Sequence, residues 1–275
     1  MRPPDFPVTR INQIHFKNPF VVLSKPTPLT NPNGRVTPDV LMYYKSLARS
    51  EAALVIAGPA TVVPPNTRKF SLLRVDQPKY LDGLRALSKI IHSNGSIAGI
   101  QVTHPGIYEA NHILKGTTSF GSNIEDFHDK KLQTAFRNAC QRSLEVGFRY
   151  VELDAAHFLL LHQLLEADRE ELLRAVFTDA IEALKGEGIV AVRFYNVTDL
   201  TIKYGSLFLE LGGDLICLET PDEGAAPFDG KLMACMDRPL PSAHIRERLA
   251  STALFGMSPD FKNKHQQIVN YFRGV

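Results

Sequence analysis

The sequence has 275 residues, of which 44% are hydrophobic and 22% charged, a composition typical of a globular domain with one sizeable core. Its 31 basic and 29 acidic side chains are interleaved and leave a formal charge of +2, which gives no indication of a nucleic acid or an anionic membrane as a partner. No window approaches 18 apolar residues, the first ten residues lack the apolar stretch of a signal peptide, and the three cysteines are widely spaced, which together favour a cytoplasmic protein.

Short β-branched runs alternate with stretches of helical period from residue 20 to about residue 220. The runs predict strands over 20–24, 53–58, 96–102, 149–154, 189–195 and 214–219. The stretches between them predict helices around 39–47, 81–91, 131–147, 163–186 and 199–211, with an irregular polar stretch up to about residue 129. Strand followed by helix, repeated without a linker, is typical of a parallel α/β fold.

This repeat predicts one domain over residues 1–275, an α/β barrel of the TIM (β/α)8 type, whose typical length is roughly 250 residues. A doubly wound open sheet is the alternative, but no G-x-G-x-x-G follows the first predicted strand. In the less regular tail, 231–236 and 251–257 are candidates for strands seven and eight, and 244–250 for a helix. Because 224–231 leaves no room for the crossover helix of a parallel pair, the barrel is shortened and its closure at these strands stays open.

The carboxyl ends of the predicted strands are polar, and these are the positions that carry the chemistry of a TIM barrel. They hold Ser24, Lys25, Thr27, Gln101, Thr103, His104, Asp154, His157, Arg193, Glu219 and Thr220. We expect several of these side chains to meet at one mouth of the barrel.

Two of these side chains suit either a ligand or a structural role. The neutral amide of Gln101 suits a planar heterocycle, but it can also cap backbone groups of the barrel. Arg193 ends an interior strand, where an unpaired guanidinium is costly, so it needs an anionic or electron-rich partner. That partner is either a ligand or, in a structural salt bridge, Glu152 or Glu219.

Asp154 and His157 are three residues apart and close enough for both to point into the mouth as an acid/base pair. A structural role for His157 is the alternative. His104 and His162 are flanked by turn or apolar residues and are more typical of structural histidines. No compact set of histidines and carboxylates predicts a metal site.

Four blocks of the sequence resemble one family of flavin enzymes. FKNPFVVLSKPT with NGRVTPDVLMYY resembles the family's first strand and the helix that follows, and ALVIAGPATVVPP resembles its second strand and loop. DGLRALSKIIHSNGSIAGIQVTHPGIY resembles the next helix and the third strand, which leads to the family's motif Q-L-x-H-x-G-R. The most specific block is FRNACQRSLEVGFRYVELDAAHFLLLHQLL, similar to G-F-D-G-V-E-L-H-x-A-H/N-G-Y-L-L-x-Q-F. Over most of its length the sequence therefore resembles the Old Yellow Enzyme family, FMN-dependent TIM barrels that reduce activated alkenes.

The resemblance implies roles for four residues. Thr27, Gln101 and Arg193 match positions that contact the isoalloxazine ring of FMN, with Arg193 near its N1/O2 side. A guanidinium there would stabilise negative charge on a reduced flavin. His157 matches the second of two donors that hold the carbonyl oxygen of the substrate.

Other positions depart from the family pattern. Asp154 replaces the first donor, a histidine, and a carboxylate there repels the charge that develops on the substrate oxygen unless it holds a proton. Leu159 replaces the tyrosine that protonates the alkene carbon, and Ile107 replaces the arginine of Q-L-x-H-x-G-R. The stretch D-E-Y-G-G-S-L-x-N-R is missing, since LLEADREELLRAVF runs straight on.

The tail departs from the family's phosphate site, which uses a Gly-Gly loop after strand seven and a Gly-Arg after strand eight. KLMACMDRPLP has no glycine pair, and Gly256 is followed by Met257. Without close backbone N–H groups and a cation, a phosphate loses most of its binding contribution, which predicts weak or absent FMN affinity. Arg238 is a candidate substitute for the missing cation.

Three functions are compatible with this pattern. The first is a divergent, flavin-dependent reductase of an α,β-unsaturated carbonyl compound, with FMN and with NADH or NADPH as reductant. The second is a flavin-independent isomerase, cyclase or other proton-transfer enzyme that uses Asp154 and His157 as acid and base. The third, which we weigh lower, is a pseudoenzyme that acts as a partner of a complete homologue. The first two imply a small-molecule substrate, and a homo-oligomer remains open.

Overall fold

A computed structural model describes most of the predicted barrel. It covers residues 9–17, 20–24, 27, 29–49, 52–64, 72–105, 129–156, 159–195, 198–220, 230–235 and 253–257. The predicted helix over 244–250 lies outside these residues. Among the helices of the described part, none is long and apolar enough to cross a membrane.

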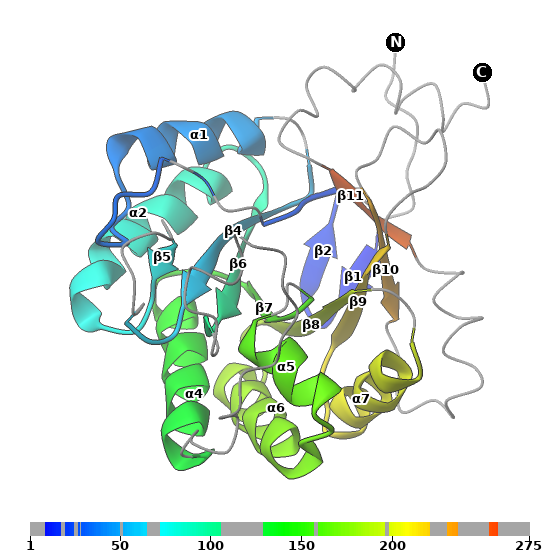
Figure 1. Ribbon diagram of the computed structural model, residues 1–275. Coiled ribbons are helices and arrows are strands. Elements are labelled where there is room, and N and C mark those ends of the chain that lie inside the picture. Colours follow the sequence, from blue (N-terminus) through cyan, green and yellow to red (C-terminus); the bar gives the residue numbers. More distant parts are fainter. Residues whose placement is uncertain are drawn as a thin grey trace, which may run out of the picture.

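Nine of the described strands form one large curled sheet (Figure 1), and eight of these nine close into a ring. In order around the ring they are β3 (Phe20–Val22), β4 (Leu54–Thr61), β6 (Ile97–Thr103), β7 (Tyr150–Ala155), β8 (Ile189–Tyr195), β9 (Leu215–Thr220), β10 (Gly230–Cys235) and β11 (Ala253–Met257). β3 pairs with both β4 and β11, so the ring closes, and β5 (Leu73–Arg74) adds to the outside of β4. The predicted barrel is confirmed.

One strand interrupts the parallel arrangement. β10 pairs antiparallel with both β9 and β11, whereas the other neighbours in the ring are parallel. Residues 221–229 are all that connect β9 to β10, and a parallel crossover needs a dozen residues or more. The irregularity that the sequence indicates between strands six and seven is therefore a reversal of strand direction.

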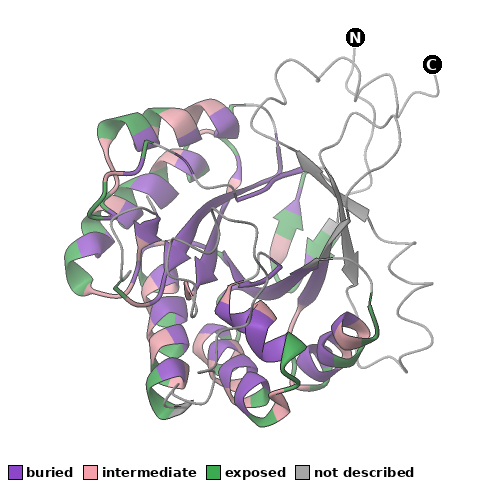
Figure 2. Ribbon diagram, in the orientation of Figure 1, coloured by how far each residue is buried: buried purple, intermediate pink, exposed green. Residues whose placement is uncertain are grey.

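Helices cover the outer side of the curled sheet (Figure 1). They are α1 (Pro38–Ala48), the 3-10 helix η1 (Pro78–Tyr80), α2 (Leu81–His92), α4 (Asp129–Glu145), α5 (Leu160–Glu166), α6 (Glu170–Leu184) and α7 (Asp199–Glu210). Their buried faces pack on the outward side chains of the strands, and their exposed faces turn to solvent (Figure 2). This layer between sheet and helices is the larger of two apolar clusters.

The smaller apolar cluster fills the inside of the ring at the amino ends of its strands. A hairpin that the sequence analysis did not predict, β1 (Thr9–Ile11) and β2 (Ile14–Phe16), contributes Ile11 and Phe16 to it. Asn12, at the hairpin turn, donates from Nδ2 to Oδ1 of Asp214 (2.9 Å) just before β9. The hairpin therefore closes this end of the barrel and leaves the carboxyl ends of the strands as its mouth.

The prediction of one helix over 163–186 is wrong, because α5 and α6 are separate helices. Asp168 between them has a positive φ of 51° and breaks the helical path. Its carboxylate accepts hydrogen bonds from Lys203 Nζ (2.7 Å) and Tyr204 Oη (2.6 Å), both on α7. Because these partners are remote in sequence, the helical period of the segment does not reveal the break.

A bulge in β4 lies beside the mouth. The register with β6 shifts between Ala57 and Ala60. Gly58, inside the bulge, has φ +113°, and a Cβ there would lie 2.9 Å from the carbonyl oxygen of Gln101. Tyr44 of α1 fixes the bulge, since its hydroxyl accepts a hydrogen bond from the Gly58 N–H (3.0 Å). Glycine at this position therefore lets β4 approach the backbone of Gln101 closely.

Candidate active site at the barrel mouth

Alternation along the strands decides which side chains reach the inside of the barrel. On β7, Val151, Leu153 and Ala155 belong to the outer apolar cluster, and Tyr150 belongs to the inner one. Glu152 and Asp154 follow Tyr150 at two-residue steps, so they share its inward face and lie nearer the mouth.

Glu152 is the centre of a buried polar group at this level. Its Oε1 accepts a hydrogen bond from Gln101 Nε2 (3.0 Å) and forms an ion pair with Arg193 Nη2 (2.8 Å). Its Oε2 accepts a hydrogen bond from the hydroxyl of Tyr150 (2.8 Å). All four side chains are at most 1% exposed. We call them the Glu152 group; its one negative and one positive charge compensate each other inside the barrel.

Tyr150 links this group to the apolar interior. Its hydroxyl lies 3.3 Å from Sγ of Cys217 on β9. Burial raises the pKa of Tyr150 and of Cys217 well above their ordinary values, so both groups keep their protons. The Tyr150 ring fits because Gly99 has no side chain: a Cβ there would lie 3.0 Å from Cδ1 of Tyr150.

The structure brings two of the three predicted flavin-contacting residues together. Gln101 and Arg193 meet at the same oxygen of Glu152, so Arg193 has one of the carboxylate partners that the sequence offered. Thr27 follows β3, is 7% exposed, and accepts a hydrogen bond from the Leu29 N–H (3.2 Å). No hydrogen bond within the described residues joins Thr27 to the Glu152 group. The roles of all three toward a flavin stay predictions.

The predicted acid/base pair is described only in part. Asp154 is 1% exposed, lies opposite Arg193 in the register of β7 and β8, and accepts a hydrogen bond from the Ala156 N–H (3.1 Å) at Oδ1. His157 lies outside the described residues, so its proximity to Asp154 stays a prediction. Lys25 and Arg238 also lie outside them. Gly256 and Met257 lie in β11 beside Val21 and Val22, and the predicted loss of the phosphate site is untested.

The structure also describes His104 and His162, the other two histidines that the sequence indicates near the strand ends. Burial lowers the pKa of His104 to about 4, so its imidazole is neutral at physiological pH. Nδ1 of His162 lies 3.2 Å from the carbonyl oxygen of Ala155, and its Nε2 lies 3.9 Å from Glu166. In the described part of the chain, no three His, Cys, Asp or Glu side chains gather as metal ligands would.

Several buried polar atoms near the mouth lack a hydrogen-bond partner within the described residues. They are Oε1 of Gln101 and the hydroxyl oxygens of Ser24, Thr30 and Thr103. A buried polar atom left without a partner costs about 1–3 kcal/mol, so such atoms are the ones a bound molecule can satisfy. An amide acceptor, hydroxyl groups and a guanidinium at the end of a barrel fit the polar edge of a flavin ring, which both donates and accepts hydrogen bonds.

The residue of the candidate site that sequence reasoning missed is Glu152, which it considered only as a salt-bridge partner. The signal was available, because Glu152 and Asp154 share one face of a predicted strand whose other face is apolar. Tyr150, two residues earlier, lies on the same face. The contact of Tyr150 with Cys217 depends on the packing of β7 and β9 and has no local signal.

A family model, described as the NADH:flavin oxidoreductase / NADH oxidase family, matches residues 6–171, more than half of the chain. An NADPH dehydrogenase of Bacillus subtilis (strain 168) is 27% identical over 190 residues, which cover 61% of this chain and 56% of that protein. The match therefore spans about half the length of that relative.

Solved structures share the fold at low sequence identity. One is morphinone reductase in complex with tetrahydroNAD (TM-score 0.70, 16% identity, 97% of this chain and 91% of that chain). Another is an old yellow enzyme homologue from Zymomonas mobilis (TM-score 0.69, 14% identity, 96% of this chain and 93% of that chain). At such identities the likeness shows the fold alone, a TIM barrel.

Proposed function

The chain belongs to the NADH:flavin oxidoreductase / NADH oxidase family, and on this basis we propose that it binds FMN at the barrel mouth and uses NADH or NADPH to reduce an α,β-unsaturated carbonyl compound. The observation that carries the proposal is the Glu152 group, which fixes Gln101 and Arg193 side by side at the end of β6 and β8. Membership of the family supports an oxidoreductase activity, which is part of the proposal. The cofactor and the reaction are the proposed part.

The residues of the mouth have distinct tasks in this proposal. Arg193 holds a positive charge, oriented by Glu152, where negative charge gathers during reduction. Gln101 is fixed through Nε2, which leaves Oε1 to accept a hydrogen bond from the ring. Thr27 offers a hydroxyl donor at the opposite side of the mouth, since its oxygen already accepts from Leu29. When bound, the flavin supplies hydride transfer.

The proton that completes an alkene reduction cannot come from Leu159, which stands where the family has a tyrosine. Leu159 immediately precedes α5 at the mouth, so this position is described and carries no acid. We therefore assign proton delivery to solvent or to another group of the mouth. His157 holds the substrate oxygen in this scheme.

An absorption spectrum with an FMN titration tests the proposal. We expect absorption bands at about 370 and about 450 nm, which NADPH bleaches in the absence of oxygen and 2-cyclohexen-1-one restores. Arg193→Lys should weaken FMN binding about tenfold or more, because a lysine keeps the charge but loses the planar fork of donors. Lys89→Ser on the exposed surface is the control. A colourless protein that ignores FMN would overturn the proposal.

A second candidate function is favoured by one observation, the burial of Asp154 inside the barrel beside the Glu152 group. A buried carboxylate at a barrel mouth is suited to proton transfer without a flavin. In that case a flavin-free preparation would turn over an isomerisation or cyclisation substrate, and Asp154→Asn would abolish the reaction while the fold persists. Turnover that depends entirely on added FMN would contradict it.

A further inference from the structure

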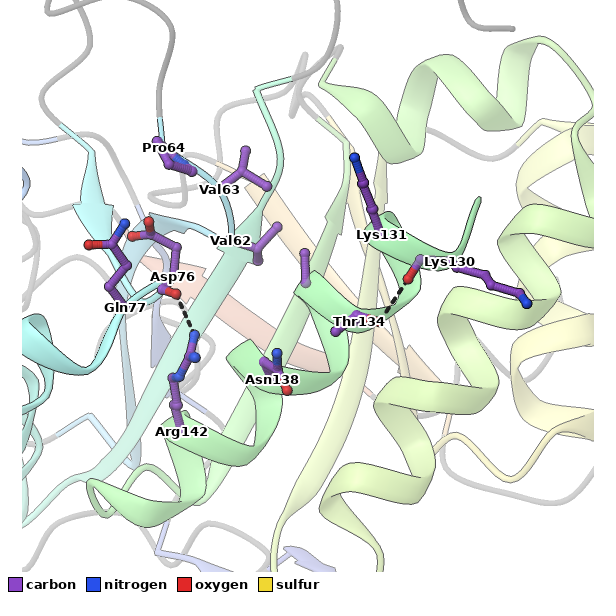
Figure 3. A pocket seen from close by; sticks show the side chains of 11 residues that line it. Val62, Val63, Pro64, Asp76, Gln77, Lys130, Lys131, Thr134, Asn138 and Arg142 are labelled. Carbon is purple, nitrogen blue, oxygen red and sulfur yellow. Dashed lines mark hydrogen bonds between the residues drawn. The ribbon is translucent and has the colours of Figure 1, made fainter. Parts of the chain in front are cut away.

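A hollow beside α4 and the barrel mouth differ in what they offer a ligand. The hollow, of about 450 Å³, lies between α4 and the segments that follow β4 and β5 (Figure 3). Its cations do not converge, since Arg142 donates to the carbonyl oxygens of Val75 (3.1 Å) and Asp76 (2.5 Å). Figure 3 also shows the Lys130 side chain on the far side of α4 from the hollow. At the mouth, by contrast, a buried acceptor of Gln101 has no partner among the described residues.

At the mouth, both oxygens of the Glu152 carboxylate are held by donors. Oε1 binds Gln101 Nε2 (3.0 Å) and Arg193 Nη2 (2.8 Å). Oε2 accepts a hydrogen bond from the Tyr150 hydroxyl (2.8 Å), which keeps its proton because burial raises the pKa of Tyr150. Since Tyr150 gives this proton to Glu152, the thiol of Cys217, 3.3 Å away, is the donor to Tyr150. The carboxylate is therefore fixed at both oxygens.

The fixed carboxylate decides which way the Gln101 amide points. A carboxylate only accepts hydrogen bonds, so Gln101 turns its donor Nε2 to Glu152 and its acceptor Oε1 away from it. Ile100 and Val102 belong to the outer apolar cluster, so Gln101 between them lies on the inner face of β6. A ligand that meets Oε1 inside the barrel must therefore bring a donor.

The other unsatisfied atoms near the mouth make no such demand. The oxygens of Ser24, Thr30 and Thr103 belong to hydroxyl groups, which rotate and can either donate or accept. Oε1 of Gln101 can only accept, and a ligand without a donor leaves it buried and unpaired. Sites built to hydrogen-bond a ligand group strongly reject analogues that lack this group. Gln101 is therefore the selective atom of the set.

Arg193 supplies the second half of the pattern, because a guanidinium only donates. Its Nη2 and Nε2 of Gln101 bind the same oxygen at 2.8 and 3.0 Å, so these two nitrogens are less than about 6 Å apart. An acceptor and a donor this close suit the edge of one planar ring that carries an N–H next to a carbonyl group. The pyrimidine half of a flavin has such an imide edge.

We propose that Glu152 is a positioning residue that selects the ligand of the mouth by fixing the amide of Gln101 beside Arg193. The ligand it selects has a ring edge with an imide N–H next to a carbonyl oxygen. The inference rests on the proposed function, because the ligand tested is FMN, and it deepens that function by assigning the choice of ligand to a residue that acts through Gln101. Substitution of Glu152 should therefore change which flavin is preferred.

Titration of the full chain with FMN and with N3-methyl-FMN, followed by flavin fluorescence, tests this without turnover. Methylation removes the imide donor, so the native chain should bind FMN at least about tenfold more tightly. In Glu152→Gln the new amide can donate to Oε1 of Gln101 and let that amide turn, so the ratio of the two Kd values should fall to about threefold or less. Glu187→Gln makes the same chemical change at an exposed residue and should keep the native ratio.

Gln101→Met separates the lost hydrogen bond from the bulk of the methyl group, because it removes the acceptor and keeps the pair of Glu152 and Arg193. The ratio that remains in this variant measures the bulk alone, and we expect Glu152→Gln to approach it. If Glu152→Gln does not fold, the double variant Glu152→Leu/Arg193→Met, which leaves neither charge unpaired, replaces it with the same expected fall. A general loss of stability would not change a ratio of two Kd values.

The outcomes separate this inference from the proposed function. Equal binding of the two flavins by the native chain would overturn the inference and leave the proposed function standing. The native ratio persisting in Gln101→Met, or in the folded Glu152 variant, would do the same. If the native chain bound neither flavin, both would be overturned.

Discussion

The inside of the barrel has two halves of opposite character, built from the same strands. On β7, Tyr150 belongs to the inner apolar cluster, whereas Glu152, two residues nearer the mouth, is a buried carboxylate. On β8, Ile189 and Ala191 are part of the apolar half, and Arg193 follows them. The change from apolar to polar thus takes place within one two-residue step along each strand.

The two halves have different tasks: the apolar half stabilises the barrel, and the polar half holds the candidate site. The apolar half is closed by the hairpin. It needs no further partner, because its side chains pack against one another away from water. The polar half contains a compensated ion pair, but also buried atoms such as Oε1 of Gln101 that lack a partner within the described residues. Residues that cost free energy where apolar ones would fit are typical of functional sites.

Removing Glu152 should have the largest effect on stability. Glu152→Leu leaves the guanidinium of Arg193 buried without this partner, and breaking a buried pair in this way costs about 3–5 kcal/mol. The double variant Glu152→Leu/Arg193→Met removes both charges and should recover most of that loss. Urea unfolding of the three proteins measures this. A single variant that loses less than about 1 kcal/mol would show that Glu152 does not hold Arg193.

The polar half should also confer sensitivity to acid. His104 has an ordinary pKa of 6.5, and burial lowers it to about 4 in the folded protein. As the pH falls from about 6.5 towards 4, the unfolded chain takes up a proton that the folded chain resists, so stability falls across that window. The full loss is on the order of 3 kcal/mol.

His104→Gln removes this titration while keeping a polar side chain. The difference in unfolding free energy between the protein and this variant should therefore change between pH 7 and pH 4 and be constant above pH 7. Contributions that are common to the protein and the variant cancel in this difference. A difference that does not vary with pH would show that His104 is not buried in its neutral form.

Gly58→Ala tests the bulge that places Gln101. The added methyl group would lie 2.9 Å from the Gln101 carbonyl oxygen, at a φ of +113°, so strain and the clash together should cost about 2 kcal/mol. Gly186→Ala is the matched control, because Gly186 also has a positive φ, 82°, but has nothing within 4 Å of the new atom. Thermal unfolding should therefore show the larger loss at Gly58, and equal losses would remove the close approach as the cause.

Much of the fold was predictable because strands and helices have local signals. The β-branched runs at 96–102, 149–154 and 189–195 match β6, β7 and β8 within a residue. The hairpin formed by β1 and β2 was missed because strands of three residues are too short to show alternation. The direction of β10 was not predictable from its own residues, because it depends on pairing with two other strands.

The candidate site was predictable in its residues but not in its connections. A polar residue at the end of an apolar strand marked Gln101, Asp154 and Arg193 directly. The contacts that join Gln101 to Arg193 pass through Glu152 and require the register of β6, β7 and β8. No single segment of the sequence reveals that register. The hydrogen bond from Arg142 on α4 to the carbonyl oxygen of Val75 likewise joins residues that are far apart in sequence.

Two conservative substitutions, one in each half, should give the smallest changes in the free energy of unfolding. The change should be a loss in the apolar half and zero or a gain in the polar half. Ile189→Val removes one methylene from the apolar half and should cost about 1 kcal/mol. Thr103→Val replaces a fully buried hydroxyl, which has no partner within the described residues, by a methyl group of the same shape. Such a change should be neutral or stabilising by up to about 1 kcal/mol.

If Thr103 instead serves a ligand, FMN binding should weaken in this variant and remain unchanged in Ile189→Val. Destabilisation of both variants to the same extent would mean that the polar half is maintained for stability, like the apolar half beneath it.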